Sequence, residues 1–364
     1  MEIYLKEKIG NPELFTGRKK DFAYFLKWTD KIKQELSMSS AILSRRKTGK
    51  TAFMQRLYNI IFHQNDKIIP FYFEIRETDQ WVLDFSEEFF LSFIYQYIAF
   101  KTRKKQYLSD FIVMSFEKAL EISRQEGFDY LIDLIEGVRS LAKEEKAFRM
   151  WETVRNIPKG IAEYNDERVV QMIDEFQFIN RYIFWDKENK RRADNLLGSC
   201  LVTAEYKHAP LLVSLRQVGW LSRNLLKMLP GRFQFHYFEN MPDQETVEMI
   251  LKYSFLENIP VAEQIVPLMA GITEGNPFYI SSLFRSKCPE KDFTTEDGLR
   301  KTLEYETLIG EGSIKGIWME YANYAMDEAN GRNAKRIVLY WADENVTKRL
   351  KNCDPTFIPH IFFA

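Results

Sequence analysis

The sequence predicts an α/β fold: a three-layer domain built on a parallel sheet, followed by an all-helical region. A short apolar run, Ala41–Leu43, leads into a glycine-bearing loop and then into a helical pattern. Apolar runs of strand length follow at Lys67–Ile75 and Glu167–Glu175, and continuous runs suit strands buried on both faces. After Pro242 the pattern is helical throughout. This change predicts a domain boundary near Met241.

The remaining elements of the α/β domain can be placed in chain order. Asp21 can cap a helix whose apolar stripe runs through Phe22–Leu36, and Thr51–Gln64 has a second amphipathic pattern. The stretch from about 84 to about 164 is helically periodic and has no strand pattern, which predicts a helical insertion. Two further strands are expected, at Ala209–Ser214 and Phe233–Phe238.

The composition argues against several classes of protein. The 364 residues are 45% hydrophobic and 28% charged with a net charge of −1, so nothing global indicates nucleic acid or an anionic membrane. The three cysteines and four histidines have no metal-ligand or disulfide spacing. The N-terminus lacks the apolar stretch of a signal peptide, and the most apolar run, Phe89–Phe100, is too short to span a bilayer. We expect a cytoplasmic protein without a membrane partner, in which this run is a buried helix.

The stretch "SRRKTGKT", residues 44–51, ends as a phosphate-binding loop does. Such a loop turns consecutive N–H groups around an anion, and the following helix adds its positive end. Lys50 would supply a charge for the outer phosphates and Thr51 a hydroxyl for Mg²⁺. Without a ligand we expect Lys50 to face solvent. The loop opens on Ser44 where glycine is usual, at a cost of roughly 1 kcal/mol if that position needs a left-handed conformation and little otherwise.

An acidic strand end would form the second half of such a site. Asp174 and Glu175 directly follow the apolar run that contains Val169 and Ile173. Asp174 would hold Mg²⁺ through water, and Glu175 would orient or deprotonate the attacking water. The alternative is a buried strand that simply enters a solvated turn.

The order of these features resembles the STAND class of P-loop ATPases, which are relatives of the AAA+ proteins, and most of all its archaeal ATPase-like branch. "LFTGRKKDFAYFL", Leu14–Leu26, resembles the entry motif that carries a Gly-Arg pair. "LLVSLRQVGWL", Leu211–Leu221, resembles the fourth-strand sensor segment, and "GITEGNPFYI", Gly271–Ile280, resembles the lid motif with its Gly-x-Pro. The resemblance covers about Phe15 to Ile280. It implies a P-loop NTPase fold with ATP and Mg²⁺ as ligands.

The resemblance also implies a role for individual residues. Gly17 and Arg18 would flank the adenine, and Pro277 would press on the base from the lid. Ser214 or Arg216 would reach the γ-phosphate, although relatives often have Gly-Ser where this chain has Leu215-Arg216. Arg232 falls where relatives often place an arginine before the fifth strand; a surface turn is the alternative. The expected loop contacts to the nucleotide are Arg45, Arg46, Lys47, Thr48, Gly49, Lys50 and Thr51.

From these features we expect three regions and a switch function. The regions are an ATPase core (1–241), a helical lid (242–310) and a C-terminal helical region (311–364) in which "AKRIVLYWADEN" resembles the first helix of a winged helix. ATP would clamp the lid, hydrolysis would release it, and a protein partner or another copy would receive the change. The alternatives are a DNA-handling ATPase of the origin-recognition type, or a scaffold without turnover. The basic run Lys101–Lys105 could contact nucleic acid or simply complement a helix end.

Overall fold

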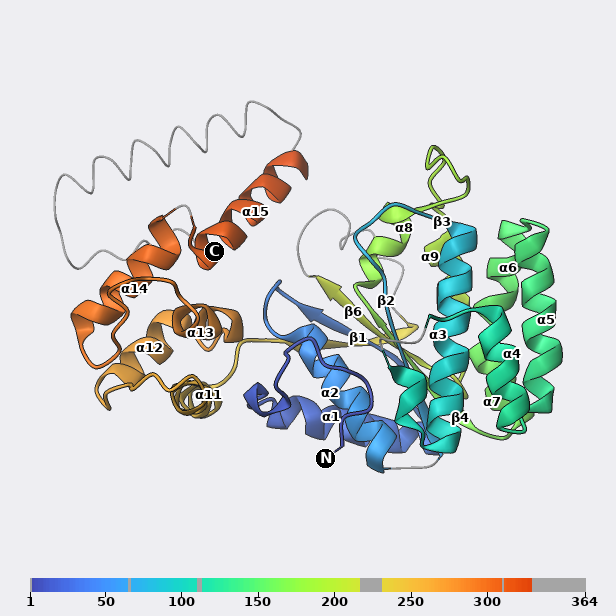
Figure 1. Cartoon of the computed structure of the whole chain (residues 1–364), viewed down its shortest axis with the longest axis horizontal. Helices are drawn as coiled ribbons and strands as arrows, with labels where there is room; N and C mark the ends of the chain where they lie inside the picture. Colours follow the sequence, from blue (N-terminus) through green and yellow to red (C-terminus); the bar gives the residue numbers. More distant parts are fainter. Residues whose placement is uncertain (1, 65–66, 110–112, 217–230, 310, 329–364) are drawn as a thin grey trace. The chain divides into compact units, whose positions relative to one another are not determined.

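The computed structural model describes residues 2–64, 67–109, 113–216, 231–309 and 311–328 (Figure 1). The chain divides into two compact units, 1–285 with 292–299, and 286–291 with 300–364. Three features singled out in the sequence lie outside the described residues: the end of the sensor segment, the stretch that resembles a winged helix, and the apolar C-terminal tail. The predicted division at 241 and 310 stays a prediction.

The first unit is built on a parallel sheet of five strands in the order β2-β4-β6-β1-β7. The strands are β1 (Ser39–Ser44), β2 (Ile68–Glu74), β4 (Arg168–Asp174), β6 (Leu211–Arg216) and β7 (Phe233–Phe238). All five apolar runs predicted to be strands are therefore strands, and β6 lies between β1 and β4. β1 is longer than predicted and includes Ser44.

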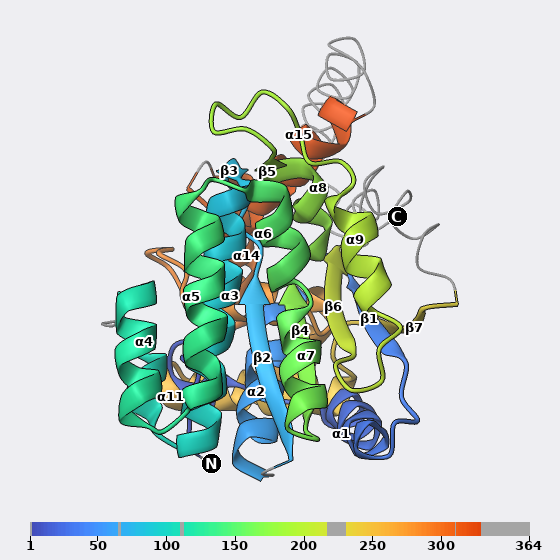
Figure 2. The same cartoon turned by 90° about the vertical axis from the view of Figure 1, so that its right-hand side faces the viewer.

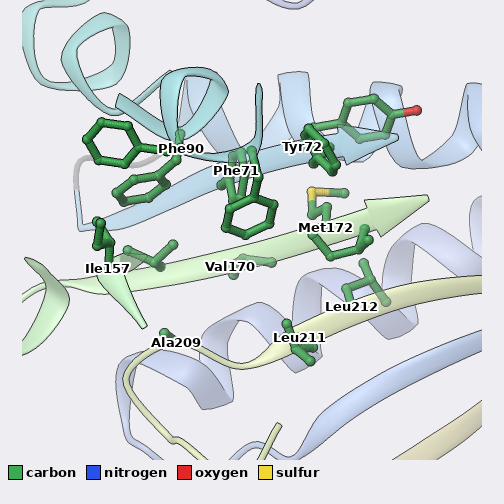
Figure 3. Packing of buried hydrophobic residues seen from close by; sticks show 14 of the residues in the cluster. Phe71, Tyr72, Phe90, Ile157, Val170, Met172, Ala209, Leu211 and Leu212 are labelled. Carbon is green, nitrogen blue, oxygen red and sulfur yellow. The ribbon is translucent and has the colours of Figure 1, made fainter. Parts of the chain in front are cut away.

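Helices cover both faces of this sheet. The helices α1 (Lys19–Lys33) and α2 (Lys50–Gln64) lie on one face, and α7 (Ile157–Tyr164) and α9 (Leu196–Thr203) lie on the other (Figures 1 and 2). Figure 3 shows side chains from β2, β4 and β6, among them Phe71, Val170 and Leu211, lying side by side in the core. The predicted three-layer α/β fold is confirmed.

Residues 82–164 form the predicted helical insertion. Its helices are α3 (Val82–Thr102), α4 (Phe116–Gln125), α5 (Asp129–Lys143), α6 (Ala147–Val154) and α7, with a 3₁₀ turn at Lys105–Leu108. The apolar run Phe89–Phe100 is buried within α3, as predicted. Gln96 of α3 accepts a hydrogen bond from the N–H of Tyr72 (2.8 Å) and donates one to its carbonyl (2.8 Å). These bonds cover the free edge of β2, which would otherwise be open to another strand.

The basic run Lys101–Lys105 is largely neutralised inside the unit. Lys101 pairs with Glu167, and Lys104 pairs with Glu126 at 2.6 Å. The Arg103 guanidinium lies 4.0 Å from the centroid of the Phe100 ring. These contacts hold the basic side chains at the end of α3, so few of their charges remain for an external polyanion.

A small second sheet was not predicted. Strands β3 (Gln80–Trp81) and β5 (Ile183–Phe184) pair in parallel, each over two residues. The 3₁₀ helix η3 (Phe176–Phe178) and α8 (Ile179–Tyr182) connect β4 to β5. Within the described residues, no helix is long and apolar enough to cross a bilayer.

The described part of the chain after β7 is mainly helical, as predicted. Helices α11 (Asp243–Leu256), α12 (Ile265–Thr273) and α13 (Pro277–Phe284) belong to the first unit, and we call these three the lid helices. The chain continues with α14 (Glu296–Leu308) and α15 (Ser313–Glu328).

Candidate nucleotide-binding site

The phosphate loop and the acidic strand end lie at the same edge of the sheet. Because the strands are parallel, their carboxyl ends meet there. Ser44, the last residue of β1, is in register with Arg216 of β6, and Ile173 of β4 is in register with Val213. Three sequence features that are far apart in the chain thus converge: the loop, the Asp174–Glu175 pair and Arg216.

Ser44 needs no glycine conformation. It is buried in β1 and is absent from the described residues with positive φ, and its hydroxyl donates a hydrogen bond to the Arg45 carbonyl at 2.9 Å. The left-handed positions of the loop are Lys47 (φ 63°) and Gly49 (φ 88°). The departure at the first position therefore costs no backbone strain, and the strained non-glycine residue is Lys47.

Lys50 opens α2 with its side chain buried. The residue is only 6% exposed, and its ammonium forms no hydrogen bond or ion pair with any described residue. The expectation that Lys50 faces solvent is therefore wrong. Since the ammonium has no partner among the described residues and Lys50 opens a helix, this position favours an anionic ligand.

The cations of the loop are crowded. Partial burial, followed by the neighbouring charges of Arg46 and Arg216, lowers the pKa of Lys47. The Lys47 ammonium also lies 5.3 Å from the centroid of the Phe278 ring of α13. Because these cations repel one another, a bound phosphate chain would relieve an existing repulsion.

Asp174 ends β4 as a fully buried carboxylate with its donors in place. It accepts hydrogen bonds from the Tyr72 hydroxyl (3.1 Å), the Glu175 N–H (3.0 Å) and the Ser214 hydroxyl. A carboxylate has about four acceptor positions, so one remains for a water on a metal. The Ser214 hydroxyl is committed to Asp174 and to the Glu175 N–H (3.0 Å), and its predicted contact with the γ-phosphate stays a prediction.

Glu175 is held by an ion pair. Its backbone is left-handed (φ 56°), and its carboxylate lies 2.8 Å from Nε of Arg216 and accepts a hydrogen bond from Gln177. The Arg216 guanidinium stacks 4.7 Å from the centroid of the Phe178 ring. The residue proposed as the base is thus paired with the residue proposed to sense the phosphate.

Arg18 connects the entry motif to the phosphate loop. Its guanidinium donates to the Thr48 carbonyl of the loop (2.7 Å) and to the Glu239 carbonyl after β7, and it lies 3.8 Å from the centroid of the Phe238 ring. Burial lowers the pKa of Arg18, while Asp21 and Glu245 oppose this shift. Its predicted place beside the adenine stays a prediction; the structure gives it a role in holding the loop.

The absence of a side chain at Gly17 lets a carboxylate from the lid helices approach the backbone closely. Glu245 of α11 accepts hydrogen bonds from the N–H groups of Arg18 (2.6 Å) and Lys19 (3.1 Å), which open α1. A Cβ on Gly17, which has φ 74°, would lie 2.6 Å from this carboxylate. Glycine is therefore required both by the backbone conformation and by the close approach.

Pro277 brings α13 against the loop. A Cβ on Gly49 would lie 3.4 Å from Cγ of Pro277. Asn276 caps α13 by accepting from the N–H groups of Phe278 (2.9 Å) and Tyr279 (3.3 Å). Pro277 therefore meets the phosphate loop itself in this structure, and its contact with a base stays a prediction.

Arg232 is not brought to this site. It precedes β7, whose first residue, Phe233, is in register with Ser39 at the start of β1. It therefore lies at the opposite edge of the sheet from the phosphate loop. Its guanidinium pairs there with Glu205 at 2.8 Å, and both side chains are largely exposed.

Several functional contacts escaped the sequence reading. Glu245, Tyr72 and Gln177 hold Arg18, Asp174 and Glu175 in place, but no motif marks them. Only Glu245 could have been noticed in the sequence, because it lies in the first turn of a predicted helix, where acidic residues are common.

The residues fit a magnesium nucleotide. Lys50, which has no partner among the described residues, opens α2, where helix N–H groups favour an anion, and three donors leave Asp174 one acceptor position. Thr51, at the second position of α2, and Asp174 are the residues that would hold Mg²⁺. Among the described residues no group of three or more His, Cys, Asp or Glu side chains could hold a metal.

No family model matches the chain, and no curated protein matches it. Solved structures do resemble it. The Walker-type ATPase PABY2304 of Pyrococcus abyssi is 14% identical, with a TM-score of 0.49 over 89% of this chain and 81% of that one. The Aeropyrum pernix ORC1 protein in complex with DNA is 12% identical (TM-score 0.46; 84% and 69%), as is the Thermotoga maritima RuvB Holliday junction branch migration motor (0.41; 84% and 76%). Identities this low say nothing about activity or partners. The strand order and the loop after β1 are those of a P-loop α/β fold.

Proposed function

We propose that this chain binds ATP·Mg²⁺ at the carboxyl edge of its sheet and acts as a slowly hydrolysing molecular switch. The observation that carries the proposal is the contact between the lid helices and the phosphate loop. Glu245 holds the start of α1, Arg18 in α1's cap holds the Thr48 carbonyl, and Pro277 meets Gly49. A ligand that enters the loop changes the same contacts that position the lid, and a protein partner or another copy would receive that change.

Different residues of the chain would bind the phosphates, hold the metal and accept the proton. Lys50 and the loop N–H groups neutralise the outer phosphates, and the crowded cations Arg46 and Lys47 add to the attraction. Mg²⁺, held through Thr51 and Asp174, would supply charge neutralisation between those phosphates. Glu175 takes the proton of the attacking water after its carboxylate leaves Arg216.

Ligand choice can be tested by thermal unfolding. A ligand at ~100-fold its Kd stabilises the folded chain by ~2.7 kcal/mol, a shift that is readily measured. We expect ATP·Mg²⁺ to stabilise the chain more than GTP·Mg²⁺. Equal stabilisation by the two nucleotides at the same concentration would remove the support for an adenine site.

The switch itself can be tested with Glu175→Gln, which keeps the shape of the side chain and removes the base. ATP should bind normally while turnover falls by roughly 10²-fold. Protease cleavage around residues 271–282 should then differ between the ATP-bound and ligand-free forms. If cleavage is identical with and without ATP, the lid does not respond and the switch is refuted.

A scaffold that binds ATP without turnover is the second candidate. The specific observation in its favour is the Glu175–Arg216 ion pair, which occupies the proposed base. In that case the wild-type chain would bind ATP without releasing phosphate, and Glu175→Gln would change neither occupancy nor lid protection.

A further inference from the structure

The segment between β5 and α9, residues 185–195, forms a fixed loop that projects beyond the carboxyl edge of the sheet (Figures 1 and 2). The Trp185 N–H donates to the Arg191 carbonyl at 2.8 Å, and the Ala193 N–H donates to the Ile183 carbonyl at 2.9 Å. Phe184 and Arg192 form an antiparallel bridge. The loop is therefore a small hairpin with a defined backbone.

One acid of the hairpin is used to build its tip. The Asp186 carboxylate accepts from the N–H groups of Lys190 (2.9 Å) and Arg191 (2.6 Å). Asn189 takes the left-handed conformation (φ 56°) that the tip requires. The Asp186 carboxylate is thus bound to the backbone, and these hydrogen bonds, with the nearby charges of Arg191 and Lys190, lower its pKa.

The hairpin displays a run of exposed cations, with Asp186 and Asp84 as the acids whose pKa they influence. Four exposed cations lie within six residues, and none forms an ion pair with a described residue: Lys187, Lys190, Arg191 and Arg192. Glu188 and Asp194 are exposed on the same loop but lie outside the consecutive run 190–192. In the other basic run, Lys101–Lys105, both Lys101 and Lys104 form ion pairs with acids of the same unit. The difference marks the hairpin as a surface for an external anion.

An exposed aromatic side chain adjoins these cations. Phe148 of α6 is 62% exposed, and its ring centroid lies 5.8 Å from that of Trp185 at the base of the hairpin. Trp81 donates its indole N–H to the Trp185 carbonyl at 3.1 Å, and the Lys187 ammonium lies 5.8 Å from the centroid of the Trp81 ring. A chain of contacts therefore joins Lys187, through Trp81 and Trp185, to the exposed ring of Phe148 at the base of the hairpin.

We propose that this hairpin binds single-stranded nucleic acid, with Arg191 and Arg192 on the phosphates and Phe148 against a base. Cations that follow a backbone, combined with an aromatic stacking face, are what such strands require. The chain's net charge of −1 disfavours binding to an anionic membrane, which would face a broad area of the protein. A single strand of nucleic acid would contact only the hairpin. The proposal does not depend on nucleotide binding at the phosphate loop.

The test uses the full chain without nucleotide and a fluorescent oligothymidylate, followed by anisotropy over a range of salt. Arg191→Glu/Arg192→Glu should weaken binding at least tenfold. It should also flatten the slope of log K against log salt by about 1.4, since each phosphate contact contributes roughly 0.7. The matched control Lys27→Glu/Lys31→Glu changes the same charge at exposed positions on α1 and should leave the slope unchanged.

Phe148→Ala separates stacking from charge. It should weaken binding roughly tenfold without changing the salt slope, because it removes no cation. Unaltered thermal unfolding shows that each variant is folded. The proposal is overturned if the wild-type chain does not bind the oligonucleotide. It is also overturned if the control substitutions on α1 reduce the affinity as much as the hairpin substitutions do. Binding of anionic vesicles, in place of the oligonucleotide, that depends on Arg191 and Arg192 overturns it as well.

Discussion

The two halves of the candidate site are in opposite states. In the phosphate loop, Lys50 has no partner among the described residues, and partial burial, followed by the neighbouring cations, lowers the pKa of Lys47. At the acidic strand end, Asp174 has three donors and Glu175 is paired with Arg216. In the proposed switch, the loop half would accept an anion as it stands, whereas the acidic half would have to rearrange before Glu175 could act on water. The proposal therefore predicts that this conformation favours binding over hydrolysis.

The largest effect should come from the loop half. Lys50→Met keeps the buried stem and removes the charge, so ATP affinity should fall roughly 10³-fold, about 4 kcal/mol. Unfolding should be unaffected because no partner of Lys50 is left unpaired. Titration calorimetry and thermal unfolding measure the two quantities. Near-normal ATP binding would mean that the loop is not the phosphate site.

The same kind of truncation in the acidic half should damage the fold instead. Asp174→Ala leaves the buried hydroxyls of Tyr72 and Ser214 without their acceptor, at a cost of about 3 kcal/mol in the free energy of unfolding. Denaturant unfolding measures this loss. Asp174→Asn is the control, because its amide oxygen can still accept one of these bonds. A stable Asp174→Ala variant would contradict the contrast between the two halves.

Arg216 tests whether the acidic half is locked. Arg216→Gln removes the ion pair with Glu175, so phosphate release by the ATP-saturated chain should rise about tenfold, or 1.4 kcal/mol. Arg216→Lys keeps the charge and should change turnover less. A fall of similar size would show instead that Arg216 serves the phosphate in the transition state.

The smallest effects concern strain in the loop. Lys47→Gly removes a left-handed non-glycine residue and should stabilise the ligand-free chain by roughly 1 kcal/mol, whereas Lys47→Ala loses the same charge and keeps the strain. Ser44→Gly should give no stabilisation, since Ser44 lies in a strand. Denaturant unfolding of the three variants compares them directly. If only Ser44→Gly stabilised the chain, the backbone strain would lie at Ser44 and not at Lys47, and the prediction would be wrong.

Local sequence predicted much of this arrangement. A strand, a GKT loop and a helix follow one another directly, and Asp174 and Glu175 directly end an apolar run, so the register of a parallel sheet brings them together. The burial of Lys50 and the conformation of Ser44 were not predicted. Both depend on where β1 ends and how the loop folds back, which periodicity does not determine.

The contacts of the lid helices lay beyond prediction for a different reason. Glu245 and Arg18 are 227 residues apart, and their hydrogen bond depends on the packing of α11 on α1. The hairpin after β5 was also missed, because strands of two residues carry no alternation. Sequence patterns thus located the chemistry, while tertiary packing decided which groups are free and which are held.

Gly17, just before α1, would affect the rate of lid opening as well as the local backbone conformation. Because Gly17 lets the Glu245 carboxylate reach two N–H groups, lid opening in the proposed switch would have to break two hydrogen bonds to a charged group. At about 1.5 kcal/mol each, they would slow opening by roughly 100-fold. A trapped ligand would leave at that slower rate. The residence time of the bound state would then be set by a contact that touches no part of the ligand.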